Sequence, residues 1–588
     1  MKLVRDNNYT TIDFESASPS FIEGFEKGIS QYTGVQEKGY EKSREYKMGF
    51  WDGYTYVYDK KKHRIADGLF NQVITYIEHV QEKLPDLTYT VTDTRDEPFL
   101  DVSDMSDTIT ALSDGKEYTL RDYQYNAVRS AIDNGRGIIG AAVNSGKSFI
   151  SVGIIKELSK YLERGEKVAY FVPTLTIFSQ IIPEFQENFG KDNVGYIGNS
   201  KRKISKINVI TLSSMASALK NPVDNLPKDK KLTGKNRTLQ IFADEIFPFF
   251  QDSQNERAIL KNLAHNYPSS TKSRAEIKGW LQDAEKTLLT NSKVRLFINK
   301  KHAEYRKVVQ SKVGDKYDKY IKTVEFAKDV KVIVVDEGHH SGADQAFKTL
   351  LSFPNAQYKF AMTGSYDPDK ELQTQRMKGL FGDVISSVSN DHLISRGISA
   401  KPIINMVKIK GALSLYPGEE KDYLRVVDVG IVHNDDRNNV IVQLVKRMYE
   451  LKKPSLIIVG RIEHGEILKD LLTELNIESV FLQGSVTGDD RQQVIDNFKQ
   501  GKLKVIIATS IFDEGLSINE FEALFMVSST RSPRLVIQRI GRVLRKKKGD
   551  NSAIVFDFYD ETNIFLKSQG DARLKIYTKE NFETRFLN

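Results

Sequence analysis

The chain has no cysteine among its 588 residues, and it has only 15 prolines and 2 tryptophans. The absence of cysteine excludes disulfide bonds, thiolate zinc sites and cysteine nucleophiles. No uninterrupted apolar run approaches the roughly 18 residues that a membrane-spanning helix needs. The N-terminal residues MKLVRDNNYTTIDFES lack the apolar core of a signal peptide. We therefore expect a protein of the cytoplasm.

The chain also has little excess of one charge. It contains 86 Lys and Arg residues and 78 Asp and Glu residues, for a net charge of +8. That balance permits a nucleic-acid partner without establishing one. With 40% hydrophobic and 28% charged residues, the composition is that of a globular protein. The length indicates three or four domains, at about 150 residues each.

Short β-branched runs alternate with helix-like segments from about residue 120 to 215 and again from 330 to 560. This pattern is typical of α/β domains, in which helices connect parallel strands. The strands we expect are GIIGAAV, KVAYFVPT, KINVITL, VKVIVVDE and YKFAMTG in the first block, and SLIIVG, SVFLQG, KVIIATS, ALFMVS and SAIVFDF in the second. We expect two tandem parallel-sheet domains, with their junction in the charged stretch around 405–430.

Three domains follow from this reading. Residues 1–105 form a small α+β domain, which we expect to bind DNA and which ends in an acidic linker, VTDTRDEPFLDVSDMSDTIT. Residues 106–404 form the first parallel-sheet domain, and residues 405–588 form the second together with C-terminal helices. A Lys-rich and Glu-rich helical insertion interrupts the first domain at about 221–328. Its charges fit either a solvated helical appendage or an arm that contacts DNA.

The strongest motif is AAVNSGKS, residues 141–148, between a strand-like and a helix-like segment. A loop at that place aims backbone N–H groups at an anion on the helix N-terminus. Gly146 lets the backbone approach phosphates, Lys147 reaches the β and γ oxygens, and Ser148 ligates magnesium. Asn144 and Ser145 complete the loop. The motif predicts a nucleoside triphosphate site.

A second motif, VIVVDEGH, ends an apolar strand with two adjacent carboxylates. Metal-assisted hydrolysis needs a charged anchor and a base, so we expect Asp336 to hold Mg²⁺ and Glu337 to polarise the attacking water. His339 and His340 point different ways because they are adjacent, and they do not predict a metal pair.

A third motif, QRIGRVLR, lies near the C-terminus. On a helix Gln538, Arg542 and Arg545 fall at i, i+4 and i+7 and share one face. Arginines that approach a transferring phosphate from a second domain stabilise its developing charge. The alternative is a solvated basic helix that runs into the lysines beyond it.

These three motifs stand in order with LRDYQ, FVPTLTIFSQ, VITLSS, TGS, SLIIVGRIEHGEIL, LQGSVTGDDRQQV and ATSIFDEGLSI. The series resembles the motifs of the superfamily 2 helicases. The resemblance implies two RecA-like domains that bind ATP and Mg²⁺ between them. The nucleotide-contacting residues that it adds to the loop are Arg121, Gln124, Glu514 and Gly515. It also implies that His339, Thr363 and Ser365 couple hydrolysis to movement, and that the nucleic-acid contacts are Pro173, Thr174, Thr211, Gly460, Arg461 and Thr509.

Two flanking segments are similar to a phage helicase of recombination and repair. They are YKMGFWDGYTYVYDKKKHRIADGLF near the N-terminus and FLKSQGDARLKIYTKENF at the C-terminus. A phage origin would mean the host cytoplasm. Trp51 lies in the first segment, among the basic residues Lys42, Arg44, Lys47, Lys60, Lys61, Lys62 and Arg64. It fits either core packing or a surface that stacks on DNA bases.

Together these features predict an ATP-dependent DNA helicase or translocase with 3′ to 5′ polarity by family resemblance. We expect it to act on branched DNA or partly double-stranded intermediates of recombination, repair and replication. The motor motifs do not decide between DNA and RNA, so an RNA helicase and a partner that is an RNA–DNA hybrid stay open. A scaffold that binds ATP without turnover is a further alternative, which the complete set of charged motif residues disfavours.

Overall fold

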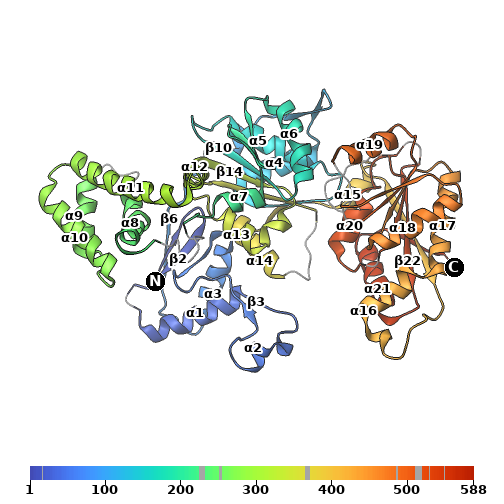
Figure 1. The fold of residues 1–588 in the computed structure, drawn as a ribbon, viewed down its shortest axis with the longest axis horizontal. Coiled ribbons are helices and arrows are strands. Elements are labelled where there is room, and N and C mark those ends of the chain that lie inside the picture. The colour runs from blue at the N-terminus through green and yellow to red at the C-terminus, as the bar shows by residue number, and fades with distance from the viewer. Residues whose placement is uncertain are drawn as a thin grey trace. The chain divides into compact units, whose positions relative to one another are not determined.

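The computed structural model describes residues 1–15, 17–223, 232–250, 255–364, 371–484, 488–509, 520–528, 530–547 and 550–587. The chain divides into two compact units. The first contains Met1–Ser214 and Asp329–Asn588, and the second contains Met215–Lys328. Figure 1 labels the elements of both. In the described part of the chain, no helix combines the length and the apolar character that crossing a membrane requires.

The N-terminal domain is a four-stranded sheet covered by two helices, as the α+β prediction required. Its strands run in the order β5-β2-β1-β6. Their bounds are β1 Lys2–Arg5, β2 Tyr9–Asp13, β5 Arg64–Ala66 and β6 Thr90–Asp93. The helices are α1 Pro19–Thr33 and α3 Phe70–Gln81. Ser18 caps α1 by accepting a hydrogen bond from the Phe21 amide, and Leu3, Ile29 and Val73 fill the core.

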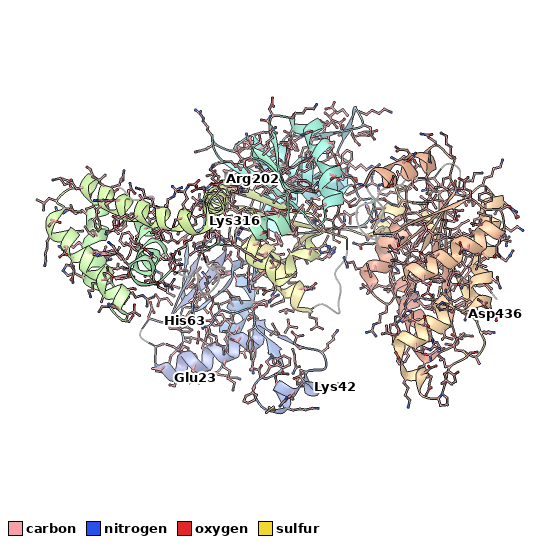
Figure 2. All side chains as sticks on the ribbon, in the orientation of Figure 1. Glu23, Lys42, His63, Arg202, Lys316 and Asp436 are labelled. Atoms are coloured by element: carbon pink, nitrogen blue, oxygen red, sulfur yellow. The ribbon has the colours of Figure 1, made fainter. Side chains whose placement is uncertain are left out.

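A small lobe extends from this domain. It consists of β3 Val35–Gln36 paired with β4 Tyr54–Thr55, with α2 Arg44–Lys47 between them. Figure 2 labels Lys42 in this lobe.

The prediction that residues 91–110 form an acidic linker is wrong. The start of this segment belongs to a strand, and its later part packs into the next domain. Strand β6 pairs in parallel with β1, from Lys2 opposite Thr90 to Arg5 opposite Asp93. Farther along, Leu100 and Met105 are buried in the core of the next domain. The segment looked like a linker because β6 is an edge strand with mostly exposed polar side chains.

Eight strands form the first parallel sheet within the described residues, in the order β12-β11-β13-β10-β14-β15-β9-β16. Only β12 runs antiparallel to its neighbour among these strands. Their bounds are β9 Arg136–Ala141, β10 Lys167–Val172, β11 Val194–Gly198, β12 Lys201–Lys203, β13 Ile207–Thr211, β14 Val330–Val335, β15 Tyr358–Thr363 and β16 Val384–Val388. The five strands expected in this block are all present.

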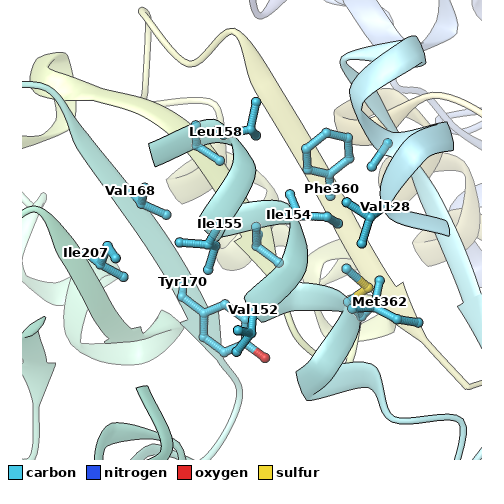
Figure 3. Packing of buried hydrophobic residues seen from close by; sticks show 14 of the residues in the cluster. Val128, Val152, Ile154, Ile155, Leu158, Val168, Tyr170, Ile207, Phe360 and Met362 are labelled. Carbon is cyan, nitrogen blue, oxygen red and sulfur yellow. The ribbon is translucent and has the colours of Figure 1, made fainter. Parts of the chain in front are cut away.

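Helices cover both faces of this sheet. They are α4 Asp122–Asn134, α5 Lys147–Ser159, α6 Leu175–Phe189, α7 Leu212–Ala218, α13 Asp344–Leu350, α14 Glu371–Phe381 and α15 Asn390–Ser395. Figure 3 shows Ile154, Ile155 and Leu158 of α5 packed against Phe360 and Val168 of the strands. Each fully buried aliphatic side chain of this kind stabilises the fold by about 1.5–3 kcal/mol. The core therefore fixes the start of α5, where the phosphate loop ends.

The second parallel sheet has seven strands among the described residues, in the order β19-β20-β18-β21-β22-β17-β23. Their bounds are β17 Lys401–Ile409, β18 Ser455–Ile458, β19 Ser479–Leu482, β20 Val505–Ala508, β21 Ala523–Met526, β22 Ser552–Asp560 and β23 Glu583–Leu587. The main helices are α16 Tyr423–Val427, α17 Asp435–Glu450, α18 Ile462–Glu474, α19 Gly488–Lys499, α20 Pro533–Gly541 and α21 Ile564–Lys579. All five strands expected here are present.

The boundary between the two sheets lies earlier than predicted. Strand β16 pairs with β9 in the first sheet, whereas β17 pairs with β22 and β23 in the second. The chain therefore crosses between Val388 and Lys401, and the boundary at 404/405 and the junction at 405–430 are wrong. The sequence KPIINMVKI was missed as a strand because its neighbours in the sheet are more than 140 residues away. The C-terminus also differs, since α21 is followed by β23 and not by another helix.

The second compact unit is the expected insertion, and it is helical. Its helices are α8 Gly234–Glu245, α9 Glu256–Asn266, α10 Lys272–Thr287, α11 Asn291–Val313 and α12 Lys316–Asp329. Phe242, Leu260, Ile277, Leu281 and Ile298 form one buried cluster, and Tyr305, Val309 and Tyr317 belong to another. The unit thus has its own hydrophobic core. Its last helix leads directly into β14.

The N-terminal domain docks on the first parallel-sheet domain through buried polar groups. Asp67 accepts hydrogen bonds from Arg5 Nε and from Arg136 Nη1, each at 2.8 Å. Lys359 of β15 is 3% exposed and donates to the Asn7 carbonyl at 2.6 Å and to the Asn8 side chain. Burial and the charge of Arg136 hold the pKa of Lys359 well below its usual range. Buried charges are costly without partners, so these contacts hold the two domains in one register.

Candidate active site

The loop between β9 and α5 bends into left-handed backbone conformations. Gly146 has φ 79°, and a Cβ atom there would overlap the Gln124 side-chain nitrogen. Asn144 has φ 68°, which asparagine tolerates better than most residues. The glycine is therefore required by both the backbone angle and the packing. The turn leaves the first amides of α5 directed out of the helix N-terminus.

Gln124 and Tyr123 of α4 hold this loop in place. Gln124 Nε2 donates to the Ser145 carbonyl at 2.9 Å, and the Tyr123 hydroxyl donates to the same oxygen at 3.0 Å. The Arg121 amide donates to Gln124 Oε1 at 2.9 Å. The Gln124 amide, which the family resemblance associates with adenine, thus also sets the shape of the phosphate loop. Tyr123 was not predicted, because its role depends on a contact 22 residues away.

The structure brings Lys147 and the acidic pair together. Lys147 Nζ lies 2.7 Å from Glu337 Oε1, and the Glu337 amide donates to Asp336 Oδ1 at 2.9 Å. Strand β14 ends at Val335, immediately before the two acids. Glu337 itself has φ 47°, a strained conformation for a residue with a side chain. Such strain turns its carboxylate toward the loop instead of along the strand direction.

Opposing effects set the charges at this site. Burial alone would lower the pKa of Lys147, but Glu337 and Asp336 outweigh it and raise that pKa. Burial likewise opposes ionisation of Glu337, yet the Lys147 charge lowers the Glu337 pKa. Burial and the neighbouring Glu337 charge raise the pKa of Asp336. A cation next to Asp336 would relieve this repulsion.

The residues present fit a triphosphate and a magnesium ion. Three buried polar atoms, Asn144 Nδ2, Ser145 Oγ and Glu337 Oε2, have no hydrogen-bond partner within the described residues. Loop amides, an ammonium group, a serine hydroxyl and carboxylates are the donor set that such a ligand takes. Lys147 would hold the phosphates, while Ser148 and Asp336 would hold the metal.

Glu184 on α6 adds a carboxylate that the sequence did not predict. It makes a side-chain hydrogen bond with Ser148, and the charge of Asp336 acts on it. Burial, helped by the charge of Asp336, raises the pKa of Glu184 to about 7, although the Ser148 hydrogen bond acts in the opposite direction. Helix α6 follows the FVPTLT segment, so only the folded chain places this carboxylate beside the loop.

The residues predicted to couple hydrolysis to movement lie next to the same loop, as far as the structure describes them. Thr363 is fully buried at the end of β15, opposite Gly140 of β9. A Cβ atom on Gly364 would lie 3.7 Å from Lys147 Nζ. His339 Nε2 accepts a hydrogen bond from Arg534 Nη1 at 2.6 Å, and burial lowers the His339 pKa to about 3. Arg534 was not predicted. Ser365 lies outside the described residues.

The third motif is only partly helical, which corrects one prediction. Helix α20 ends at Gly541 and Arg542 caps it, so Gln538 and Arg542 stay one turn apart. Arg545 forms a β-bridge with Ser399 and does not share their helical face. The helix ends at the glycine, a residue that weakens helices. A Cβ atom on Gly541 would lie 2.6 Å from Val143 of the phosphate loop, so Arg542 follows directly after a residue that touches this loop. The Arg542 charge opposes protonation of Lys147. Glu514 and Gly515 lie outside the described residues.

The predicted nucleic-acid contacts are not equally accessible. Pro173 and Thr174 lie between β10 and α6, where the Thr174 hydroxyl caps α6 by accepting from the Ile177 amide. Thr211 is 1% exposed, and its hydroxyl donates to Ser214 Oγ at 2.7 Å. In this structure Thr211 positions its neighbours and offers little surface to a ligand.

The remaining contacts lie in the second parallel-sheet domain and the small lobe. Gly460 is exposed before α18, and Arg461 donates to Asp428 and to the Leu424 carbonyl, each at 3.2 Å. Thr509 follows β20 and is partly buried. Trp51 is also partly buried, and its indole donates to the Tyr54 carbonyl at 2.7 Å. Exposure in the lobe falls instead on Phe50, at 79%, and Met48, at 53%.

Two family models match the chain. "Helicase conserved C-terminal domain" matches residues 436–547, and "Type III restriction enzyme, res subunit" matches residues 117–268. The protein "Putative helicase 22" of Sulfolobus islandicus filamentous virus is 22% identical over 77% of this chain and 66% of its own length. "ATP-dependent DNA helicase uvsW" of Enterobacteria phage T4 is 23% identical over 42% of this chain and 49% of its own length.

The chain thus spans about half to two thirds of the length of these relatives. The crystal structure of T4 UvsW aligns with 100% of this chain and 98% of its own at 16% identity, with a TM-score of 0.40. UvsW is the phage helicase to which the flanking segments pointed, and the sequence match confirms a resemblance to it.

Proposed function

The chain belongs to the superfamily 2 helicases, and on that premise we propose that it uses ATP and Mg²⁺ to translocate along branched DNA and unwind it. The direction is 3′ to 5′. The reactions are junction branch migration, fork regression and the unwinding of D-loops or R-loops, in recombination, repair and replication. The observation that carries this proposal is the convergence of Lys147, Asp336 and Glu337 on one loop, with the Arg542 charge nearby.

Each residue has a separate task in hydrolysis. Lys147 neutralises charge on the β and γ phosphates, and Glu337 accepts the proton of the attacking water. Ser148 and Asp336 would hold a magnesium ion, which would supply Lewis-acid charge to the phosphates when bound. Arg542 stabilises the charge that develops on the transferring phosphoryl group. Before ATP binds, Lys147 and Glu337 are paired with each other. This pairing suits a motor that hydrolyses little ATP in the absence of nucleic acid.

The names of the relatives support DNA by a small margin. Three of them are named as DNA helicases or translocases, and two are named as RNA helicases. The preference for branched DNA is supported by the small lobe, where Phe50 and Met48 are exposed beside Lys42, Arg44 and Lys47. Exposed aromatic side chains stack on unpaired bases, and lysines contact phosphates.

The test is the ATPase rate, measured side by side with single-stranded DNA, duplex DNA, a four-way junction and RNA. We expect the junction to stimulate most. Stronger stimulation by RNA would support an RNA helicase, and ATP binding without turnover would support a scaffold. For the lobe, Phe50→Ala should reduce junction affinity while basal ATPase persists. Phe586→Ala, which truncates an exposed phenylalanine of β23 in the second parallel-sheet domain, is the matched control.

A further inference from the structure

The net positive charge of the chain is concentrated in its helical unit, residues 215–328. This unit contains 23 of the 86 Lys and Arg residues but only 13 of the 78 Asp and Glu residues. Its formal net charge is therefore +10. The rest of the chain has 63 basic and 65 acidic residues, for a net charge of −2. The helical unit therefore carries the net positive charge that attracts a polyanion at long range.

Some of the basic side chains in this unit serve the fold. Arg295 of α11 pairs with the buried Glu256, and Arg306 pairs with Asp318 of α12 at 2.6 Å. Lys301 lies 4.1 Å from the centre of the Trp280 ring. These contacts stabilise the helix packing and leave little of that charge to a ligand.

Three lysines on α11 are different. Lys293, Lys300 and Lys307 are exposed, and no ion pair or side-chain hydrogen bond of theirs is found within the residues that the structure describes. They recur every seven residues, so they lie along one side of the helix. Val294, Ile298, Tyr305 and Val309 form the buried side. The lysine row is about 21 Å long at the rise of an α-helix.

More lysines follow in the sequence, outside this row. Lys312, Lys316 and Lys319 are exposed at the end of α11 and on α12, and Figure 2 labels Lys316. Asp315 and Asp318 lie among them, so the charge is densest on α11 itself. We define the lysine face as Lys293, Lys300 and Lys307.

We propose that the lysine face of α11 binds the phosphate backbone of nucleic acid, as a second contact surface separate from the motor motifs. This inference rests on the proposed function, since it adds to the grip of a nucleic-acid motor. Duplex DNA carries one negative charge per about 1.7 Å of helix axis, so 21 Å of helix faces many phosphates.

The composition of the face favours nucleic acid over an acidic protein. Protein interfaces are depleted of lysine and enriched in aromatic residues at their centres. On the lysine face the exposed neighbours include Leu296 and Ala303, while the aromatic Phe297 is partly buried. Glu304 also borders the face, and its carboxylate lies 3.6 Å from Lys301 Nζ. Lysines act on phosphates as flexible point charges and need no shaped pocket. Binding here is therefore independent of base sequence.

The test replaces the three lysines by glutamine in the full chain and measures the affinity for a short fluorescent DNA duplex across a salt series. We expect affinity to fall about tenfold to hundredfold near 0.15 M salt, and the slope of log K against log salt to decrease by up to about 2.7. ATPase without DNA should not change, because these side chains lie outside the nucleotide site. The melting temperature should not change either, since none of the three lysines forms an ion pair with any residue that the structure describes.

Two control variants separate charge from other causes. Arginine at the same three positions keeps the charge, and it should keep the affinity. Glutamine at Lys446, Lys469 and Lys499 removes the same charge from helices of the second parallel-sheet domain, and it should cost less affinity and less salt slope.

The outcomes distinguish the two proposals. If the unaltered chain neither binds DNA or RNA nor hydrolyses ATP faster with them, the proposed function fails. If the unaltered chain binds but the glutamine variant binds equally well with an equal salt slope, the lysine face is not a nucleic-acid surface. Its charge would then serve another polyanion, such as an acidic protein.

Discussion

Lys147 Nζ lies 2.7 Å from Glu337 Oε1, although 190 residues separate them in the chain. This ion pair joins the phosphate loop to the acidic motif across the carboxyl edge of the first sheet. Both side chains are about one-fifth exposed, so water reaches the pair in part. A triphosphate must draw Lys147 away from Glu337 and thereby release the carboxylate to act as a base.

Lys147→Ala should lower ATP hydrolysis by at least about 10³-fold, because the charge on the β and γ phosphates loses its cation. Nucleic-acid binding should largely persist. Steady-state ATPase of a variant shown to be folded checks this. Lys160→Ala, on the residue that follows α5, is the control and should hydrolyse ATP normally. A rate for Lys147→Ala within about tenfold of the parent would be incompatible with this site.

Glu337→Gln should bind ATP without turnover, because the amide keeps the volume but cannot accept a proton from water. The amide oxygen can still accept a hydrogen bond from Lys147, so the loop should keep its shape. Equilibrium nucleotide binding, combined with steady-state hydrolysis, measures both effects. Ordinary turnover would mean that another carboxylate is the base, and Glu184→Gln would be the variant to examine next.

Arg542→Ala should lower hydrolysis by about 10³-fold with a smaller effect on ATP affinity, as expected for an arginine finger. Arg545→Ala should cost less than about tenfold, because Arg545 leaves the helical face and bridges to Ser399. Comparing kcat and the ATP dissociation constant of the two variants tests this. If both variants lose the same large factor in kcat, both arginines act in hydrolysis. Normal hydrolysis with weak DNA binding would favour a solvated basic helix.

Asp67→Asn should destabilise the protein by about 3–5 kcal/mol, since Arg5 and Arg136 would stay buried without their carboxylate. Burial opposes ionisation of Asp67, but Arg5 and Arg136 lower its pKa overall. Its stabilisation is therefore present above the unfolded pKa of about 3.9 and is lost as pH falls through the folded value.

Melting temperatures at neutral pH and near pH 3 check this. The difference between parent and Asp67→Asn should be large at neutral pH and should shrink in acid. Asp93→Asn is the matched control, because Asp93 is 41% exposed beside Arg95 and should contribute at most about 1 kcal/mol. A difference for Asp67→Asn that does not depend on pH would mean that its charge is unimportant for docking.

The sequence predicted the parts of this protein that are local in the chain. The loop around Lys147 and the acids at the end of β14 follow from short motifs, and buried parallel strands follow from apolar runs. Glu184, Arg534 and Tyr123 were missed because each acts through a partner on another element. Strand β17 was missed because its pairing with β22 spans more than 140 residues, and composition alone suggested a junction. The end of α20 was missed because the arginine spacing assumed a continuous helix.

Strand β17 also determines how the two parallel-sheet domains can pull on each other. It follows the crossing segment directly, and it lies inside the second sheet, paired in parallel with β22 along Lys401–Ile409 and with β23 along Ile403–Val407. Tension from the first domain therefore enters the second along the strand axis and shears two rows of hydrogen bonds together. Such a load must break many bonds at once, whereas peeling breaks them one by one. The strand that connects the two domains is thus held firmly in the second sheet by its pairing with β22, and its pairing with β23 adds to this resistance.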